Sequence, residues 1–453
     1  MSTLEAQADA VSRIEPMQLS GVVAALRGLT ILVDELPAPV GTLVRIGAAG
    51  RGRDSFGEIV GFTREHTIVM PLGQTIGISP GDRVQTDLAS DTVGVGNRLL
   101  GRCVDGLGRP IDSLGPILDL VPRPISPPPV SAMRRRRIRE PLHTGVRAID
   151  LMATLGRGQR IGVFSGPGIG KSSLLGQIAR TSDADVNVIA LIGERGREVR
   201  EFIDDSLGPE GLARSVVVVS TSDESPLMRV RAAQVACAAA EFFRDQGKDV
   251  MLMMDSVTRF AHAQRQIGLA VGEPPATKGY TPSVFARLAL LLERAGTIES
   301  ADGTTGGSIT GVYTILVEGD DMTEPIADAA RGILDGHLIL SRRLAQRAHF
   351  PPIDVLDSVS RVADDVSDDD HIAARKVIVR LLAAYAEVED LVQIGAYARG
   401  SNPEADVAID YHPRINEMFR QGRFEVQPFE TTRAHLLRLA MESSEALGKL
   451  KQE

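Results

Sequence analysis

The feature that most constrains the fold of this chain is a glycine-rich segment between an apolar run and an amphipathic one. The segment consists of Gly166, Pro167, Gly168, Ile169, Gly170, Lys171, Ser172 and Ser173. The apolar run at 161–164 predicts a strand, and the spacing of Leu174, Leu175 and Ile178 predicts a helix. Glycines let successive backbone N–H groups turn inward toward phosphate oxygens, and the start of a helix adds a partial positive charge. We therefore interpret the segment as a phosphate-binding loop.

The polar side chains of this loop have expected tasks. Lys171 reaches the β- and γ-phosphates of a nucleotide, and the Ser172 hydroxyl ligates magnesium. The usual pattern begins with a glycine at the position that Ser165 occupies here. The alternative is a glycine-rich turn with an exposed lysine, which does not account for the flanking strand and helix. ATP and Mg²⁺ are the expected ligands.

Length and composition limit the class of protein. A chain of 453 residues suggests two or three domains, and 43% hydrophobic with 24% charged residues is typical of a globular protein. The formal net charge of −9 argues against a general nucleic-acid binder. Two distant cysteines, Cys103 and Cys237, form neither a disulfide framework nor a zinc cluster. With a charged start and no long apolar stretch, the sequence predicts a cytoplasmic protein.

The first ninety residues fall into two parts. Residues 1–18 carry apolar residues at helical spacing and are interpreted as a partner-binding segment, with a frayed terminus as the alternative. The apolar residues concerned are Leu4, Ala8, Val11 and Ile14. Residues 19–90 contain short β-rich runs broken by Gly, Pro and Asp, which predicts a small β-barrel domain.

Residues 91–370 are predicted to form an α/β domain. Five prolines between 122 and 129 mark an extended connector. The basic run at 134–139 is interpreted as a solvated linker, in preference to a nucleic-acid or lipid contact. Apolar segments then alternate with helical ones, which predicts a parallel sheet covered on both faces. These segments are Val186–Ile192, Val216–Val219, Val250–Met254 and Val312–Val317. Residues 371–453 are predicted to be mostly helical, with helices at 371–396 and 431–449.

Two carboxylates follow buried strands. Asp255 ends the run 251–254, where an acid lies at the carboxyl edge of the sheet beside the magnesium held by Ser172, unless it merely caps the next helix. Glu194 also directly follows a strand and could polarise the water that attacks the γ-phosphate. On residue type alone, Glu194 could equally be an ordinary surface glutamate.

Several motifs in uninterrupted order resemble the catalytic subunits of the rotary ATP synthase superfamily. They are Ser165–Ser172, Gly193–Glu198, Asp255–Phe260, Pro351–Arg361 and the Leu99–Pro110 turn. Other segments look like the flagellar and type III protein-export ATPases within that superfamily. They are Glu273–Tyr280, Glu318–Asp321, Asp328–Leu340 and Ile394–Tyr397. The resemblance covers residues 20 to 440.

This resemblance implies an architecture and residue roles. The architecture is an N-terminal β-barrel, a RecA-like nucleotide domain and a helical C-terminal domain, assembled as a ring of six identical chains. Glu194 would be the general base, Arg195 and Glu198 would support the phosphate and magnesium shell, and Asp255 would hold magnesium through water. Arg361 would be the arginine finger of the neighbouring subunit's site. The adenine pocket would be lined by Phe350, Phe424 and Phe429, for which core packing is the alternative.

The resemblance also implies a function and partners. The expected function is ATP hydrolysis that energises protein export through a flagellar or type III secretion apparatus. The expected partners are a stator-like regulator at the N-terminus, a stalk protein in the ring centre, export substrates with their chaperones, and the membrane export gate, but no nucleic acid. The main alternative is a catalytic subunit of a proton- or sodium-coupled rotary ATP synthase. A nucleic-acid motor and a non-catalytic nucleotide-binding scaffold are weaker alternatives, because aromatic residues make up only 4% of the chain and Glu194 is present.

Overall fold

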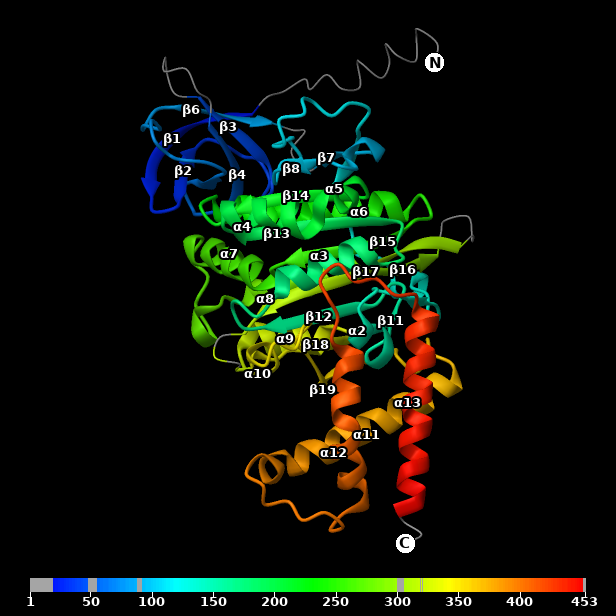
Figure 1. Ribbon diagram of the computed structural model, residues 1–453. Helices are drawn as coiled ribbons and strands as arrows, with labels where there is room; N and C mark the ends of the chain where they lie inside the picture. The colour runs from blue at the N-terminus through cyan, green and yellow to red at the C-terminus, as the bar shows by residue number, and fades with distance from the viewer. Residues whose placement is uncertain are drawn as a thin grey trace, which may run out of the picture.

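The computed structural model describes residues 19–47, 55–87, 92–299, 305–317, 319 and 321–450. Three parts follow one another along the long axis of the molecule: a barrel, a central α/β part and a helical part (Figure 1). The fold class predicted from the sequence is confirmed by this arrangement. The predicted partner-binding segment 1–18 lies outside the described residues.

The N-terminal part is a closed six-stranded barrel with the strand order β1-β2-β5-β4-β3-β6. Its strands are β1 (Ser20–Arg27), β2 (Thr30–Asp34), β3 (Leu43–Gly47), β4 (Ser55–Phe62), β5 (Thr67–Pro71) and β6 (Arg83–Asp87). Alternate side chains such as Ile31, Val33, Val44 and Ile46 point inward and are almost fully buried. Because β6 pairs with β1, the barrel leaves no unpaired strand edge.

The central part is built on one large sheet with the order β19-β18-β12-β17-β15-β13-β14-β8. Its strands are β8 (Cys103–Val104), β12 (Arg160–Ser165), β13 (Val186–Glu194), β14 (Ser215–Thr221), β15 (Asp249–Asp255), β17 (Thr305–Leu316), β18 (Gly336–Leu340) and β19 (Ile353–Ser360). Strands β8 to β18 along this order are parallel, while β19 and the side strand β16 (Gly296–Glu299) are antiparallel to their neighbours. The carboxyl ends of the parallel strands therefore meet at one edge.

Helices cover both faces of this sheet (Figure 1). Side chains of β13 alternate between two apolar clusters: Val188 and Ile192 join one, and Ile189 and Leu191 join the other. The first face is covered by α6 (Pro226–Arg244), α7 (Val257–Ala270), α8 (Pro282–Leu292) and α9 (Pro325–Ile333). The second is covered by α2 (Arg147–Met152), α3 (Lys171–Thr181), α4 (Gly196–Glu201), the π-helical turn Phe202–Leu207 and α5 (Gly208–Ala213). Burial on both faces explains the continuous apolar strands.

Short elements complete the central part. The two-stranded sheets pair β7 (Thr92–Val95) with β9 (Val121–Pro124) and β10 (Pro141–Leu142) with β11 (Leu155–Gly156). Short 3₁₀ turns lie at Asn97–Leu99, Ala132–Arg134 and Thr277–Gly279. Within the basic run, Arg135 is committed to this domain, because its guanidinium pairs with Glu293 and donates to the Ala295 carbonyl. Of the described residues, no helix is long and apolar enough to cross a membrane.

The C-terminal part contains three helices, α11 (Asp369–Gln393), α12 (Pro403–Phe419) and α13 (Phe429–Leu450). The first and last coincide closely with the two predicted helices. The middle helix was not predicted, because Pro413 lies inside it and interrupts the helical pattern. Asn402 caps its start by accepting from the N–H groups of the first turn.

The acidic run after Arg361, which the sequence pattern does not explain, has structural tasks. Asp364 pairs with the buried Arg375 at 3.0 Å. Asp368 is the N-cap of α11, where it accepts from the His371 N–H at 2.9 Å and pairs with Arg433 of α13 at 2.7 Å. These bonds from Arg433 and His371 lower the pKa of Asp368 to about 2. The run therefore ties α11 to the central part and to α13.

Replacing Asp368, the N-cap residue of α11, should destabilise the helical part. We expect Asp368→Ala to lower the free energy of unfolding by about 1 kcal/mol, the typical loss for an N-cap carboxylate. Urea unfolding followed by circular dichroism measures this difference. The nearby exposed carboxylate Asp365 provides the matched control, and Asp365→Ala should change the free energy of unfolding by less than about 0.5 kcal/mol. Equal losses in the two variants would contradict the capping role.

Candidate nucleotide site

The glycine-rich loop joins two elements of the central sheet region. Strand β12 ends at Ser165 and helix α3 begins at Lys171, so the loop opens at the carboxyl edge of the sheet. Gly168 and Gly170 have φ angles of +75° and +104°, which side-chain-bearing residues rarely adopt. Ser165 is buried, and its hydroxyl has no hydrogen-bond partner among the described residues. The loop thus has the strand, turn and helix arrangement of a phosphate-binding site.

Three charged side chains converge beside the loop. The Lys171 ammonium group pairs with Asp255 Oδ1, and its Nζ lies 3.7 Å from Glu194 Oε1. Glu194 ends β13 and Asp255 ends the neighbouring strand β15, so the parallel pairing itself brings the two carboxylates together. Thr314 of β17 donates to Asp255 Oδ1 at 2.8 Å and holds that carboxylate in place. The structure therefore brings together three residues that the sequence analysis chose separately.

The environment of Glu194 changes its proton affinity. Burial of its carboxyl group and the negative charge of Asp255 raise the pKa of Glu194 to about 7, against the attraction of Lys171. Glu194 Oε1 has no hydrogen-bond partner within the described structure. A carboxyl group that exchanges its proton near neutral pH, with an oxygen available for bonding, is suited to general base work.

The sequence analysis did not identify Arg259 as a site residue. Its Nε lies 3.7 Å from Glu194 Oε1, and it enters the site from the first turn of α7. A Cβ on Gly193 would lie 2.8 Å from Arg259 Cδ, so only glycine leaves room for this side chain beside the strand end. The sequence feature that points to Arg259 is its position shortly after Asp255. The first turn of a helix that follows such a strand lies at the same edge of the sheet as the end of the strand.

The other residues predicted for the phosphate and magnesium shell are more exposed. Arg195 and Glu198 pair with each other at 3.2 Å on the first turn of α4, with side chains 77% and 45% exposed. Ser172 and Ser173 are exposed at the start of α3. The described residues contain no group of three or more His, Cys, Asp or Glu that could hold a metal ion. A metal here would therefore depend on water and nucleotide oxygens for most of its ligands, which suits Mg²⁺ better than Ca²⁺ or Zn²⁺.

The three candidate adenine-pocket phenylalanines occupy different environments. Phe350 is 48% exposed and reaches to 4.0 Å from the position of a Cβ on Gly170, so it borders the loop. Phe424 is 68% exposed, and the guanidinium groups of Arg180 and Arg423 lie over its ring, at 4.7 Å and 5.2 Å from the centroid. The backbone joins the two regions, because the Gln421 N–H donates to the Phe350 carbonyl at 2.8 Å.

Phe429 differs from the other two aromatic residues. Its ring stacks on His143 at 4.0 Å between centroids and packs against the apolar cluster beneath α3. It begins helix α13 and contacts His371 of α11 as well. These contacts favour core packing, the alternative left open by the sequence.

Arg361 lies far from the loop of its own chain. It follows β19, which is antiparallel to β18 with Ser360 opposite Gly336, and β18 is parallel to β12. Its N–H donates to the carbonyl of Asp335, whose carboxylate pairs with Arg160 at the start of β12. The six residues of β12 separate this edge from the loop by roughly 20 Å at about 3.3 Å per residue. The Arg361 side chain is exposed, and its Nη2 donates to the Arg331 carbonyl at 3.4 Å.

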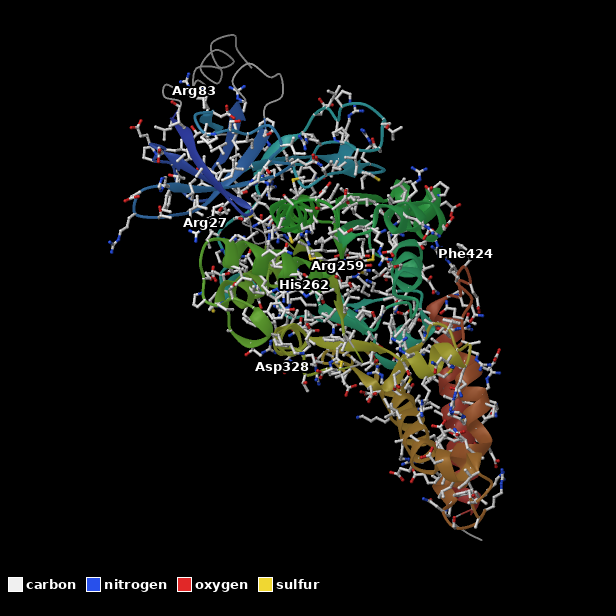
Figure 2. All side chains as sticks on the ribbon, turned by 90° about the vertical axis from the view of Figure 1, so that its left-hand side faces the viewer. Arg27, Arg83, Arg259, His262, Asp328 and Phe424 are labelled. Atoms are coloured by element: carbon white, nitrogen blue, oxygen red, sulfur yellow. The ribbon has the colours of Figure 1, made fainter. Side chains whose placement is uncertain are left out.

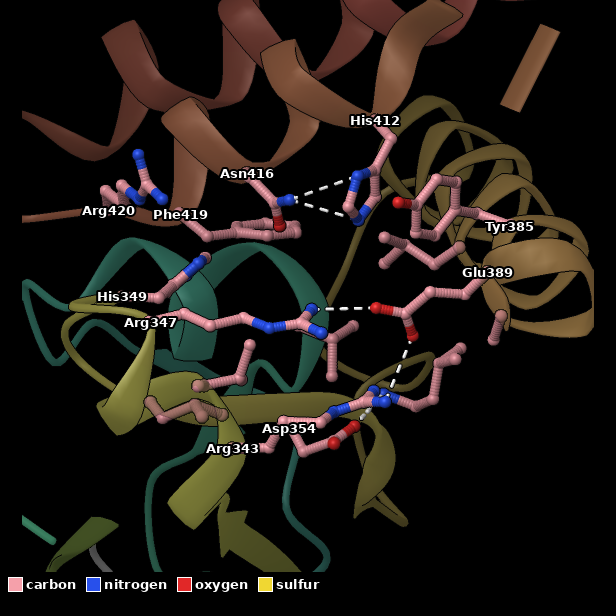
Figure 3. A pocket seen from close by; sticks show the side chains of 16 residues that line it. Arg343, Arg347, His349, Asp354, Tyr385, Glu389, His412, Asn416, Phe419 and Arg420 are labelled. Atoms are coloured by element: carbon pink, nitrogen blue, oxygen red, sulfur yellow. Dashed lines mark hydrogen bonds and ion pairs between the residues drawn. The ribbon is translucent and has the colours of Figure 1, made fainter. Parts of the chain in front are cut away.

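A second group of charged side chains connects the nucleotide site to the helical C-terminal part. A cavity of about 130 Å³ lies between α10 (Arg342–Gln346), β19 and the helices α11 and α12 (Figure 3). Glu389 of α11 binds Arg343 at 3.0 Å and Arg347 at 2.7 Å, and its side chain is only 7% exposed. Because Arg347 precedes Phe350 by three residues, this ion-pair cluster anchors the segment that borders the loop.

Comparisons with known proteins agree with this geometry. Residues 145–360 match the family model "ATP synthase alpha/beta family, nucleotide-binding domain", and residues 367–438 match "T3SS EscN ATPase C-terminal domain". The chain is 48% identical to the flagellum-specific ATP synthase of Bacillus subtilis, covering 95% of this chain and 97% of that protein. It is 52% identical to the type 3 secretion system ATPase of Xanthomonas euvesicatoria, covering 83% and 84% respectively.

The chain is also similar to solved structures of type III secretion ATPases. The assembled ATPase EscN from the type III secretion system of enteropathogenic E. coli matches with a TM-score of 0.85 and 40% identity, over 93% of this chain and all of that one. EscN in complex with its central stalk EscO matches with a TM-score of 0.84 and 41% identity over the same shares.

Gly193 provides a test of the site geometry. Gly193→Ala adds a Cβ that collides with Arg259 Cδ, and it forces a side-chain-bearing residue to φ +71°. We expect the turnover of ATP to fall at least about tenfold, which corresponds to about 1.4 kcal/mol of lost transition-state stabilisation. Steady-state kinetics measures this. The control is Gly196→Ala, where the described structure leaves open space around the added Cβ. Wild-type turnover in Gly193→Ala would contradict the geometry.

Proposed function

Because this chain belongs to the family of flagellum-specific and type 3 secretion ATPases, within the ATP synthase alpha/beta family, we propose that its ATP hydrolysis energises protein export. The reaction is ATP and water to ADP and phosphate. The observation that carries the proposal is the convergence of Lys171, Glu194 and Asp255 beside the glycine-rich loop. A protein that only stores nucleotide has no need of a buried carboxylate placed in this way.

In this proposal Lys171 and Glu194 perform the chemistry. The loop N–H groups and Lys171 bind the β- and γ-phosphates and offset the charge that develops on the leaving oxygens. Lys171 is paired with Asp255 in the described state, so bound phosphates exchange this ion pair for their own. Glu194 then accepts a proton from the attacking water, and its raised pKa suits that task near neutral pH. The charged side chains around these groups, which help to orient them, are those of Arg195, Arg259 and Glu198.

Magnesium is part of this proposal. The Ser172 hydroxyl, the Asp255 carboxylate acting through water, and Glu198 nearby are the residues that would hold it. The exposed Ser172 and the buried Asp255, whose Oδ1 accepts from Lys171 and Thr314, fit an ion that keeps most of its waters. When bound, the ion neutralises charge on the β- and γ-phosphate oxygens. Phe350 and Phe424 would hold the adenine ring by stacking, whereas the contacts of Phe429 favour a packing role.

We further propose that the chain acts as a ring of six identical subunits. Arg361 cannot serve its own site, because it lies at the opposite edge of the sheet. In a ring, its guanidinium would reach the γ-phosphate held by the neighbouring subunit. The relative EscN has been solved as an assembled ATPase and with its central stalk EscO, which supports a ring and a stalk protein here. The N-terminal segment 1–18 would hold a stator-like regulator.

The export role places the protein at the membrane gate of the apparatus, with secreted proteins and chaperones as its cargo. The match of residues 367–438 to a secretion-ATPase family model favours this role over that of a rotary ATP synthase subunit. Co-purification with a membrane sector and a non-catalytic partner chain would favour the synthase instead. Loss of motility or of secreted protein after deletion of the gene, with ATP synthesis unchanged, is the expected outcome for an export ATPase.

Replacing the proposed base separates binding from hydrolysis. Glu194→Gln should bind ATP with magnesium and hydrolyse it at least about a hundredfold more slowly, because the positioned base is lost. Phosphate release and fluorescent-nucleotide binding measure the two properties. Lys171→Ala, which removes the counter-charge of the phosphates, should weaken both binding and hydrolysis. If Glu194→Gln weakens binding while hydrolysis persists, Glu194 is a ligand and not the base.

Replacing Arg361, the proposed arginine finger, should leave the glycine-rich loop of each chain intact. Arg361→Ala should bind nucleotide and assemble, yet hydrolyse ATP about a thousandfold more slowly. Arg361→Lys should not restore the rate, because a point charge does not reproduce the planar guanidinium. The measurement is turnover of fully assembled rings, with assembly checked by light scattering. A rate within a few-fold of the parent would show that Arg361 is structural.

A further inference from the structure

The exposed ring of Phe424 is held by cations and not by apolar packing. Among the described residues, Phe424 belongs to none of the three apolar clusters, whereas Phe429 packs against one of them. The two guanidinium groups over the ring come from Arg180, in the last turn of α3, and from Arg423, which directly precedes Phe424. Figure 2 shows Phe424 on the segment that runs from the helical part up along the side of the central part. Guanidinium groups are attracted to the face of an aromatic ring, so these two contacts favour one orientation of the ring.

The two arginines are themselves fixed by hydrogen bonds to the backbone. Arg180 Nη2 donates to the Arg423 carbonyl at 2.7 Å. Arg423 Nη2 donates to the carbonyl of Asp205, and it lies 3.1 Å from the Ser206 hydroxyl oxygen, which also accepts from it. Asp205 and Ser206 belong to the π-helical turn that follows α4. The ring is thus tied through Arg423 to the central part, although it lies on a segment of the C-terminal part.

The same turn packs tightly on the helix that follows the glycine-rich loop. A Cβ on Gly176 of α3 would lie 2.7 Å from Ser206 Cβ, so glycine is needed for this close approach. Helix α3 begins at Lys171 and carries Arg180 in its last turn. One helix therefore positions the lysine of the proposed phosphate site and one of the two cations over Phe424.

Stability of the free chain does not explain this arrangement of charges. Within the described part of the chain, Arg180 Nη1 and Arg423 Nε are buried without a hydrogen-bond partner. Burial and the nearby charge of Arg423 lower the pKa of Arg180. Buried donors without acceptors and adjacent like charges are both costly. Such costs are typical of residues kept for a ligand.

We propose that Arg180 and Arg423 are positioning residues that orient the Phe424 ring for stacking on the base of the nucleotide. The inference rests on the proposed function, in which Phe424 holds adenine. The ring is 68% exposed, so a planar base can reach it. A ring that is oriented before the nucleotide arrives loses less freedom on binding, which strengthens stacking without adding a contact.

A comparison of ADP with inorganic pyrophosphate tests this role, because pyrophosphate has the phosphates without the base. Arg423→Ala should raise the Kd of ADP about fivefold, as expected for the loss of a cation–π contact, and change the Kd of pyrophosphate less than about twofold. Isothermal titration calorimetry with Mg²⁺ measures both constants, and neither ligand requires hydrolysis. Arg423→Gln, which lacks the charge, should behave like Arg423→Ala. The matched control is Arg399→Ala, whose side chain is 64% exposed and pairs with Asp410; it should change neither constant.

A double-mutant cycle shows whether Arg423 acts through the ring. Phe424→Ala should raise the Kd of ADP about tenfold, the usual effect of losing a base–aromatic stack. Adding Arg423→Ala to Phe424→Ala should raise it no further, because the residue to be positioned is already absent. Melting temperatures check that each variant is folded.

Three results would overturn this inference. They are an unchanged Kd of ADP in both Arg423 variants, equal rises for ADP and pyrophosphate, and fully additive losses in the double variant. Failure of the proposed function looks different. If the parent hydrolyses no ATP while the expected differences between ADP and pyrophosphate are found, the proposed function falls and the role of Arg423 in base recognition stands.

Discussion

The lysine and carboxylate cluster at the carboxyl edge of the sheet is the interaction on which the site depends. The Lys171 ammonium group pairs with Asp255 and lies 3.7 Å from Glu194, where it offsets the repulsion between two carboxylates that lie close together. Parallel pairing of β13 with β15 brings the acids together, and the glycine-rich loop positions the lysine opposite them. If nucleotide phosphates bind at the loop as proposed, they compete with these carboxylates for the same ammonium group.

Much of this arrangement could be predicted from the sequence because it is local. The glycine-rich loop, the strand-ending Glu194 and Asp255, and the alternation of apolar segments all lie within short windows whose physical meaning does not depend on the rest of the chain. Arg259 had a local signal in its closeness to Asp255, but Arg229, whose Cδ lies 3.5 Å from the position of a Cβ on Gly193, could not be found in this way, because that proximity depends on how α6 packs. The acidic run near Asp368 was uninterpretable for the same reason, since its partner Arg433 is sixty-five residues away.

The segment after α10 connects the nucleotide site with the helical part. Phe350 borders the glycine-rich loop, and Arg347, three residues earlier, is bound by Glu389 of α11. The Phe350 carbonyl also accepts from Gln421, which follows α12. A movement of this aromatic ring on nucleotide binding would therefore act on two helices of the C-terminal part through short polar contacts. The Glu389 side chain is only 7% exposed, whereas Arg343 and Arg347 are 62% and 47% exposed, so the buried carboxylate is the fixed point that holds the segment to α11.

The single antiparallel strand next to β18 has a consequence for catalysis. If β19 ran parallel to its neighbour, Arg361 would end at the carboxyl edge, near the Lys171 of its own chain. Because β19 runs the other way, Arg361 emerges at the amino edge, beside Asp335 and Arg160. A lone subunit then holds the glycine-rich loop and the proposed base Glu194 on one edge and the exposed Arg361 on the other. If Arg361 is the arginine finger as proposed, two such subunits complete each other head to tail, since one contributes its loop edge and the other its arginine edge. Repeated contacts of this kind close into a ring when the rotation between neighbours allows it, and under this proposal hydrolysis depends on the interface between subunits.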